Sequence, residues 1–181
     1  MRVALRAPAA AIPLSWVFGV CPVISPRAGL ASIEAAPWFY ERYFMHKWRG
    51  SLKRKQALQP DRELFSDEEL RGGMRDLTER MVQRHTDFGT LENYLDGYSI
   101  AGSTLAALSV PATILTAADD PVIPVVDFRA LTLAPQTELT IVEHGGHCGF
   151  IRDASLRSWA EDFLVARMQR VVGAELTRAR A

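Results

Sequence analysis

Three short apolar runs, each ending in a turn that carries reactive or turn-forming side chains, constrain the fold of this chain more than any other feature. The runs are 14–20 (LSWVFGV), 110–117 (VPATILTA) and 137–142 (TELTIV). Their β-branched and aromatic residues are typical of strands, and long segments with helical periodicity separate them. Such crossovers are what parallel strands require. We therefore expect an α/β chain with a parallel sheet, in which the run 14–20 is buried on both faces.

The intervening segments predict helices. Between Pro37 and Gln56, apolar side chains recur every four residues opposite a basic side, as in an amphipathic helix. Ser66 and Glu69 have the spacing of a capping box. No segment between 22 and 103 resembles a strand. The expected helices are 37–56, one that starts at Ser66, one that Thr90 caps, a short one at 127–133 and one that Asp153 caps.

Composition excludes some classes of protein. With 181 residues, 48% of them hydrophobic, the chain can bury a core, and its 21 basic residues balance 21 acidic ones. No net charge draws it to nucleic acid. Two cysteines, Cys21 and Cys148, are too few for a disulfide scaffold, which favours a reducing cytoplasm, and we expect both to be small apolar fillers. The first twenty residues fit a signal peptide poorly because arginine and prolines interrupt them, and no apolar run is long enough to span a bilayer.

Acidic and histidine side chains follow the second and third runs. Asp119-Asp120-Pro121 follows one, and His144-Gly145-Gly146-His147 follows the other. Ligands of open parallel sheets bind beyond the carboxyl ends of the strands, so an acid and a histidine from these turns can meet there. Such a pair is what a triad uses to orient an imidazole. Taken singly, each is better explained as a structural turn or loop residue. A metal site of His144, His147 and Cys148 is disfavoured because it has no fourth ligand nearby.

The motifs ILTAADDPVIP and VEHGGHCGFI resemble the end of the α/β-hydrolase fold, most closely the YheT-like branch of esterases and lipases. The likeness continues through VCPVISP, YERYFMHKWRGSLKRKQ and YLDGYSIAG, and it covers nearly the whole chain. The family's triad acid directly precedes Pro-x-x-Pro, which matches Asp120, with Asp119 as a solvated neighbour. Its triad histidine is the second of His-Gly-Gly-His, which matches His147, with His144 left for packing or support.

The resemblance implies an incomplete hydrolase fold. It would comprise C-terminal parallel strands with flanking helices and a helical cap insertion. The expected parts are 1–25 (a helix end and a core strand), 26–102 (the cap) and 103–181 (the rest of the core, with the acid and histidine loops). Tyr40, Phe44 and Trp48 would form an apolar wall facing substrate or, as an alternative, would attach the cap to the core.

The nucleophile that this family needs is missing, because the chain contains no Gly-x-Ser-x-Gly elbow. The nearest segment, Gly97-Tyr98-Ser99-Ile100-Ala101, fits a helix and lies too close to Asp120. The family places its elbow just before a helix resembling RVALRAP, so we expect the chain to begin shortly after the nucleophile. The run 14–20 would then lack a neighbour, and an exposed strand edge promotes self-association.

These observations predict the C-terminal part of a serine hydrolase of carboxylic esters, inactive as it stands. The full-length parent would act on a small-molecule or lipid ester, without a cofactor. The alternative is a non-catalytic remnant or binding module with a similar fold. A third possibility is that the basic stretch Lys47–Lys55 contacts nucleic acid or a membrane surface. A solvated helix face explains the same run of basic residues equally well.

Overall fold

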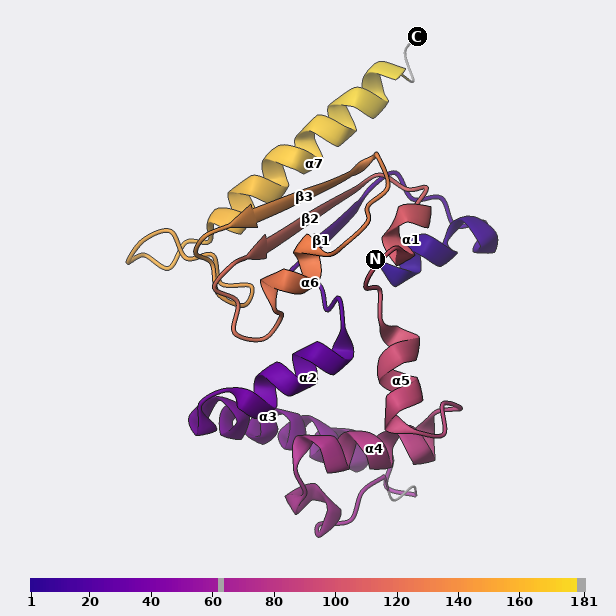
Figure 1. Ribbon diagram of the computed structural model, residues 1–181, viewed down its shortest axis with the longest axis vertical. Coiled ribbons are helices and arrows are strands. Elements are labelled where there is room, and N and C mark those ends of the chain that lie inside the picture. Colours follow the sequence, from indigo (N-terminus) through magenta and orange to yellow (C-terminus); the bar gives the residue numbers. More distant parts are fainter. Residues whose placement is uncertain (62–63, 179–181) are drawn as a thin grey trace. The chain divides into compact units, whose positions relative to one another are not determined.

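The computed structural model describes residues 1–61 and 64–178. The chain is mixed α/β and forms two compact units (Figure 1). Unit 1 comprises Met1–Ile24 and Ile100–Ala181, and unit 2 comprises Ser25–Ser99. The chain leaves unit 1 at Ile24 and returns at Ile100, whose N–H donates to the Ile24 carbonyl at 2.9 Å. Unit 2 is therefore an insertion in the sequence of unit 1.

Unit 1 contains a 3-stranded parallel sheet in the order β1-β2-β3. The strands are β1 (Val17–Val20), β2 (Ala112–Ala117) and β3 (Thr137–Val142). Every residue of the central strand β2 is buried, as its continuous apolar sequence indicates. The expected α/β class and parallel strands are confirmed.

Strand β1 differs from its expected form. It has four residues instead of seven, and all four are only half-buried. The expectation of burial on both faces was wrong because β1 lies at the end of the strand order, next to β2 alone among the described strands. Leu14, the first residue of the apolar run, instead packs beside helix α1 (Arg2–Arg6).

Two apolar clusters hold the sheet. At the start of β2, Ala4 of α1 packs with Leu108, Val110 and Ala112. At its other end, Ala160 of helix α7 (Trp159–Arg178) packs with Leu115, Ala117 and Phe150. Figure 1 shows α7 running beside β3, to which an ion pair between Arg167 and Glu138 joins it. The remaining helical segments of unit 1 are short: η1 (Pro8–Ala10), η3 (Thr104–Ala107) and α6 (Val125–Arg129).

The C-terminal helix begins later than expected. Asp153 does not cap it: its Oδ1 accepts from the Ser155 N–H at 2.9 Å in a turn. That turn closes an antiparallel bridge between Ile151 and Ser158, and Leu156 has a left-handed φ of 61°. The helix starts only at Trp159. Helix α6 is also displaced from its expected range of 127–133.

The described residues of unit 2 are helical and include no strand, as expected. Helix α2 was not predicted, although Ser25 caps it by accepting from the Ala28 N–H at 3.2 Å. In helix α3 the buried residue is Met45, whereas Tyr40, Phe44 and Trp48 are half-buried or exposed. Thr90 caps the helix expected there. The helices of unit 2 are α2 (Pro26–Ala35), α3 (Trp38–Ala57), η2 (Glu69–Arg71), α4 (Met74–His85) and α5 (Leu91–Tyr98).

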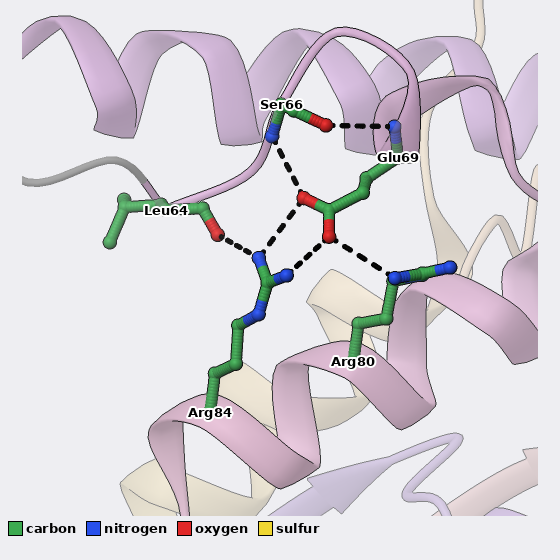
Figure 2. A network of polar contacts seen from close by, with 5 residues as sticks. All are labelled: Leu64, Ser66, Glu69, Arg80 and Arg84. Carbon is green, nitrogen blue, oxygen red and sulfur yellow. Dashed lines mark hydrogen bonds and ion pairs between the residues drawn. The ribbon is translucent and has the colours of Figure 1, made fainter.

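The capping box at Ser66 forms, but the long helix expected after it does not. Ser66 N–H donates to Glu69 Oε2 at 2.9 Å, and Glu69 N–H donates to Ser66 Oγ at 3.2 Å. Only η2 follows, because Gly72 and Gly73 interrupt the backbone before α4. Figure 2 shows that Glu69 instead binds α4, because Arg80 and Arg84 of that helix both form ion pairs with its carboxylate.

No helix in the described ranges 1–61 and 64–178 has the combined length and apolarity that crossing a bilayer requires.

Candidate active site

The candidate residues lie where the three strands of unit 1 end. Cys21 directly follows β1, Asp119 and Asp120 follow β2, and His147 and Cys148 lie in the loop after β3. Because the strands are parallel, all these loops leave the same edge of the sheet. This carboxyl edge is where open α/β sheets bind ligands.

The structure brings Asp120 and His147 together. Asp120 Oδ2 lies 3.0 Å from His147 Nδ1. The Asp120 side chain is fully shielded from solvent, whereas that of His147 is 36% exposed. The pair therefore combines a buried carboxylate with an imidazole that solvent reaches.

Backbone donors fix the carboxylate in place. Asp120 Oδ1 accepts from the N–H groups of Val122 and Ile123 at 2.8 and 3.0 Å. Two backbone N–H donors on one carboxylate oxygen suit the ionised form of Asp120, which can only accept hydrogen bonds. His147 must then donate through Nδ1–H, and in the neutral ring Nε2 carries the lone pair. An imidazole oriented in this way can take a proton from a hydroxyl or a water.

Asp119 and His144 have different roles from those expected. Asp119 is more than a solvated neighbour, because its Oδ1 accepts from the N–H groups of Gly145 and Gly146 at 2.9 and 2.8 Å. These bonds, from Gly146 foremost, lower the pKa of Asp119 below its ordinary value. His144 does not pack in the core, because its side chain is 81% exposed, and its Nδ1 lies 3.5 Å from Asp119 Oδ2.

The two glycines let the loop pass close to the sheet. A Cβ on Gly145 would lie 2.5 Å from the Phe150 ring and 3.0 Å from Ala117 Cβ. Gly146 has a φ of 56°, a left-handed conformation that glycine adopts without cost. The spacing of the His-Gly-Gly-His motif thus follows from close packing at Gly145 and a turn at Gly146.

The cysteines join this site, which the sequence interpretation missed. Cys148 is exposed rather than an apolar filler, and Cys21 is buried. Burial raises the pKa of the Cys21 thiol to about 12 and also raises that of Cys148. One ligand atom each of Cys21, His147 and Cys148 lies within 4.8 Å of the others. The set of His144, His147 and Cys148, which was disfavoured from the sequence, does not share this spacing. In the described residues the group that does contains Cys21 in place of His144. The position of Cys21 directly after a strand is the signal that identifies it.

Ser99 does not form a nucleophile elbow. It follows the last residue of α5 with an extended backbone, φ −62° and ψ 141°. It therefore ends a helix, whereas an elbow serine links a strand to a helix.

Two hollows among the described residues of unit 2 differ in chemical character. One of about 730 Å³ is apolar and includes Phe44 and Trp48 in its lining, together with Met74, Met81 and Tyr94. The other, of about 670 Å³, is lined by basic residues of α3, and Asp67 and Arg71 close it. Phe44 and Trp48 thus line a hollow within unit 2, which is the kind of surface an apolar substrate group requires.

No protein-family model matches this chain, and no curated protein sequence has significant similarity to it.

Proposed function

We propose that Asp120 and His147 are the acid and the base of a serine hydrolase that acts on carboxylic esters. The observation that carries this proposal is the 3.0 Å contact between Asp120 Oδ2 and His147 Nδ1 at the carboxyl edge of a parallel sheet. The acid also precedes the histidine in the chain, which is the order of the α/β-hydrolase triad. We propose that the sheet belongs to an incomplete fold of that kind, resembling the YheT-like branch.

Each residue has one role in the proposed reaction. His147 Nε2 accepts the proton of a serine hydroxyl as the oxygen attacks the ester carbonyl. The same nitrogen returns that proton to the departing alcohol, and water then releases the acyl group by the same route. Asp120 keeps Nδ1 protonated and stabilises the imidazolium that forms at each step.

On this proposal the nucleophilic serine comes from outside these 181 residues. They contain no Gly-x-Ser-x-Gly, and Ser99 ends a helix. We propose that a preceding segment of the parent protein supplies the elbow and the oxyanion hole. Each oxyanion-hole donor is worth roughly 3 to 4 kcal/mol of transition-state stabilisation, so the chain as given is expected to be inactive.

The test begins with the DNA upstream of the Met1 codon. If that DNA encodes an in-frame Gly-x-Ser-x-Gly, the chain is expressed with the upstream segment included. This extended protein is then treated with a fluorophosphonate probe and with p-nitrophenyl esters. We expect the extended protein to label and to hydrolyse esters. The 181-residue chain is expected to do neither, in the wild type and in Ser99→Ala alike.

Variants of the extended protein test the dyad itself. We expect His147→Gln and Asp120→Asn to lower kcat by about 10² to 10⁴, because the imidazole is lost or held in the wrong tautomer. His144→Gln is the matched control and should keep kcat. Activity that survives His147→Gln would refute the assigned base. Stop codons upstream in place of an elbow would favour the non-catalytic alternative. If the 181-residue chain is labelled and Ser99→Ala abolishes that labelling, Ser99 is the nucleophile.

A further inference from the structure

Two thiols and one imidazole converge at the carboxyl edge of the sheet from separate parts of the chain. Cys21 comes from the end of β1, while His147 and Cys148 come from the loop after β3. Their ligand atoms lie within 4.8 Å of one another. In the described residues this is the one group of three such side chains with that spacing. Neither cysteine has a part in the proposed hydrolysis.

The backbone at both cysteines is held in an unusual conformation. Cys21 has a φ of 42° and Cys148 a φ of 65°, in the left-handed region that residues with a Cβ rarely adopt. Each sulfur also faces the main chain of the opposite segment, with Cys21 Sγ 3.9 Å from the Gly146 carbonyl and Cys148 Sγ 3.9 Å from that of Val20. Strained positions of this kind concentrate at functional sites.

We propose that Cys21, His147 and Cys148 bind one thiophilic divalent cation, for which Zn²⁺ is the expected ion. Two thiolates and one imidazole are the donors that Zn²⁺ prefers, at about 2.0 to 2.3 Å. The ligand atoms lie within 4.8 Å of one another without an ion. Small movements of the exposed Cys148 and His147 side chains would bring them to these bonding distances around one ion. Mg²⁺ and Ca²⁺ prefer oxygen ligands and would not bind.

Asp120 completes the arrangement. Its carboxylate already binds one ring nitrogen of His147 at 3.0 Å. A carboxylate behind a ligating histidine is the usual support of a zinc-bound imidazole, because it fixes the ring and raises its basicity. Three protein ligands leave a fourth position for water or another small ligand.

Metal binding would take the imidazole that the proposed hydrolysis needs. With His147 coordinated, no lone pair remains to accept the serine proton, so we expect Zn²⁺ to inhibit the extended enzyme reversibly. This consequence rests on the proposed function, whereas the metal site does not. The binding test therefore uses the 181-residue chain and no ester.

The experiment titrates the reduced chain with Co²⁺ and then with Zn²⁺, using a phosphine reductant that does not compete for metal. Thiolate-to-cobalt charge-transfer absorption should saturate at one equivalent, and Zn²⁺ should abolish it. Cys148→Ser is the first variant because this side chain is exposed and its loss should not disturb folding. The absorption should fall to about half, since one of two thiolates is lost, and Zn²⁺ affinity should fall at least about tenfold.

His147→Gln and His144→Gln complete the set. We expect His147→Gln to weaken Zn²⁺ binding at least about tenfold while both thiolate bands remain, and His144→Gln to bind as the wild type does. The site is refuted if charge-transfer absorption is absent, if Cys148→Ser leaves it unchanged, or if His144→Gln weakens binding as much as His147→Gln. An inactive extended enzyme would leave these results unaffected.

Discussion

Single residues decide the shape of the loop that carries His147. Asp119 holds Gly145 and Gly146 through their N–H groups, and Asp120 holds the imidazole. Asp119 thus fixes the main chain of the loop, and Asp120 fixes the side chain of His147. A change at either glycine is therefore felt at His147, although neither glycine takes part in proton transfer.

Gly145→Ala tests this close packing. The new Cβ would lie 2.5 Å from the Phe150 ring and 3.0 Å from Ala117. Overpacking of this kind costs roughly 1 to 3 kcal/mol, and we expect that loss in the free energy of unfolding measured with urea. Gly173→Ala is the matched control: a Cβ there meets nothing within 4 Å, and in helix α7 it should be neutral or stabilise by up to about 1 kcal/mol. Equal effects of the two variants would refute the packing argument.

The roles of the individual site residues could be predicted from the sequence only in part. The ends of the predicted strands selected the two turns, because strand ends of a parallel sheet share one edge. The family resemblance then selected Asp120 and His147 within those turns. The role of Asp119 was missed because a bond from a carboxylate to distant main-chain N–H groups leaves no periodic signal. Cys21 was taken as a filler because its burial was correctly suspected, but its neighbours in space were unknown.

At the scale of elements, one carboxylate joins two helical segments of unit 2. Glu69 accepts from Ser66 N–H at 2.9 Å, from Arg80 at 3.1 Å and from both terminal nitrogens of Arg84 (Figure 2). Hydrogen bonding by Arg84, followed by that from Ser66, lowers the pKa of Glu69 from 4.5 to about 2. A lowered pKa means that folding favours the ionised form.

The expected pH dependence follows from that direction. The stabilisation by Glu69 is complete above its unfolded pKa of 4.5 and is lost as the pH falls towards about 2. We expect Glu69→Gln to be less stable than the wild type at pH 7, with the difference vanishing near pH 2. Urea unfolding at a series of pH values measures it. Glu68→Gln, at an exposed neighbouring position, should show no such trend, and a Glu69→Gln deficit that persists at pH 2 would contradict the network.

Element types were better predicted than their bounds. The helix at 37–56 and the strand at 137–142 follow from periodicity, which their packing does not override. The start of α7 was misplaced because Asp153 can form either a cap or a turn, and the bridge between Ile151 and Ser158 selects the turn. Helix α2 was missed although Ser25-Pro26 is a helix-start signal.

At the scale of the molecule, the sheet ends at β1. Within the described residues β1 pairs with β2 alone, so its other edge presents unpaired main-chain groups. We expect the chain to self-associate, with a mass by light scattering that rises with protein concentration. Phe18→Lys should lower this tendency, because a charge on an edge strand opposes pairing. Val126→Lys, which replaces an exposed apolar residue outside the strands, is the control. A monomer at all concentrations that melts cooperatively would contradict the expectation.

The parallel sheet was predictable as a whole because crossover lengths and strand composition agree. The half-buried state of β1 was not, since burial depends on what lies on both sides of a strand. The composition of the run 14–20 predicts a strand buried on both faces, whereas the missing neighbour implied by the family resemblance predicts an edge. Among the described strands, the order places β1 at an edge.

The bond between Ile100 N–H and the Ile24 carbonyl has a consequence for how such a chain can vary. Because this hydrogen bond joins the two ends of the insertion, we expect that residues 25–99 can be exchanged or shortened without altering the order of the strands. A swap of residues 25–99 for a short glycine-rich bridge would leave Asp120, His147 and both thiols on their original scaffold. Residues 24 and 100 therefore form a natural junction at which a different insertion could be grafted.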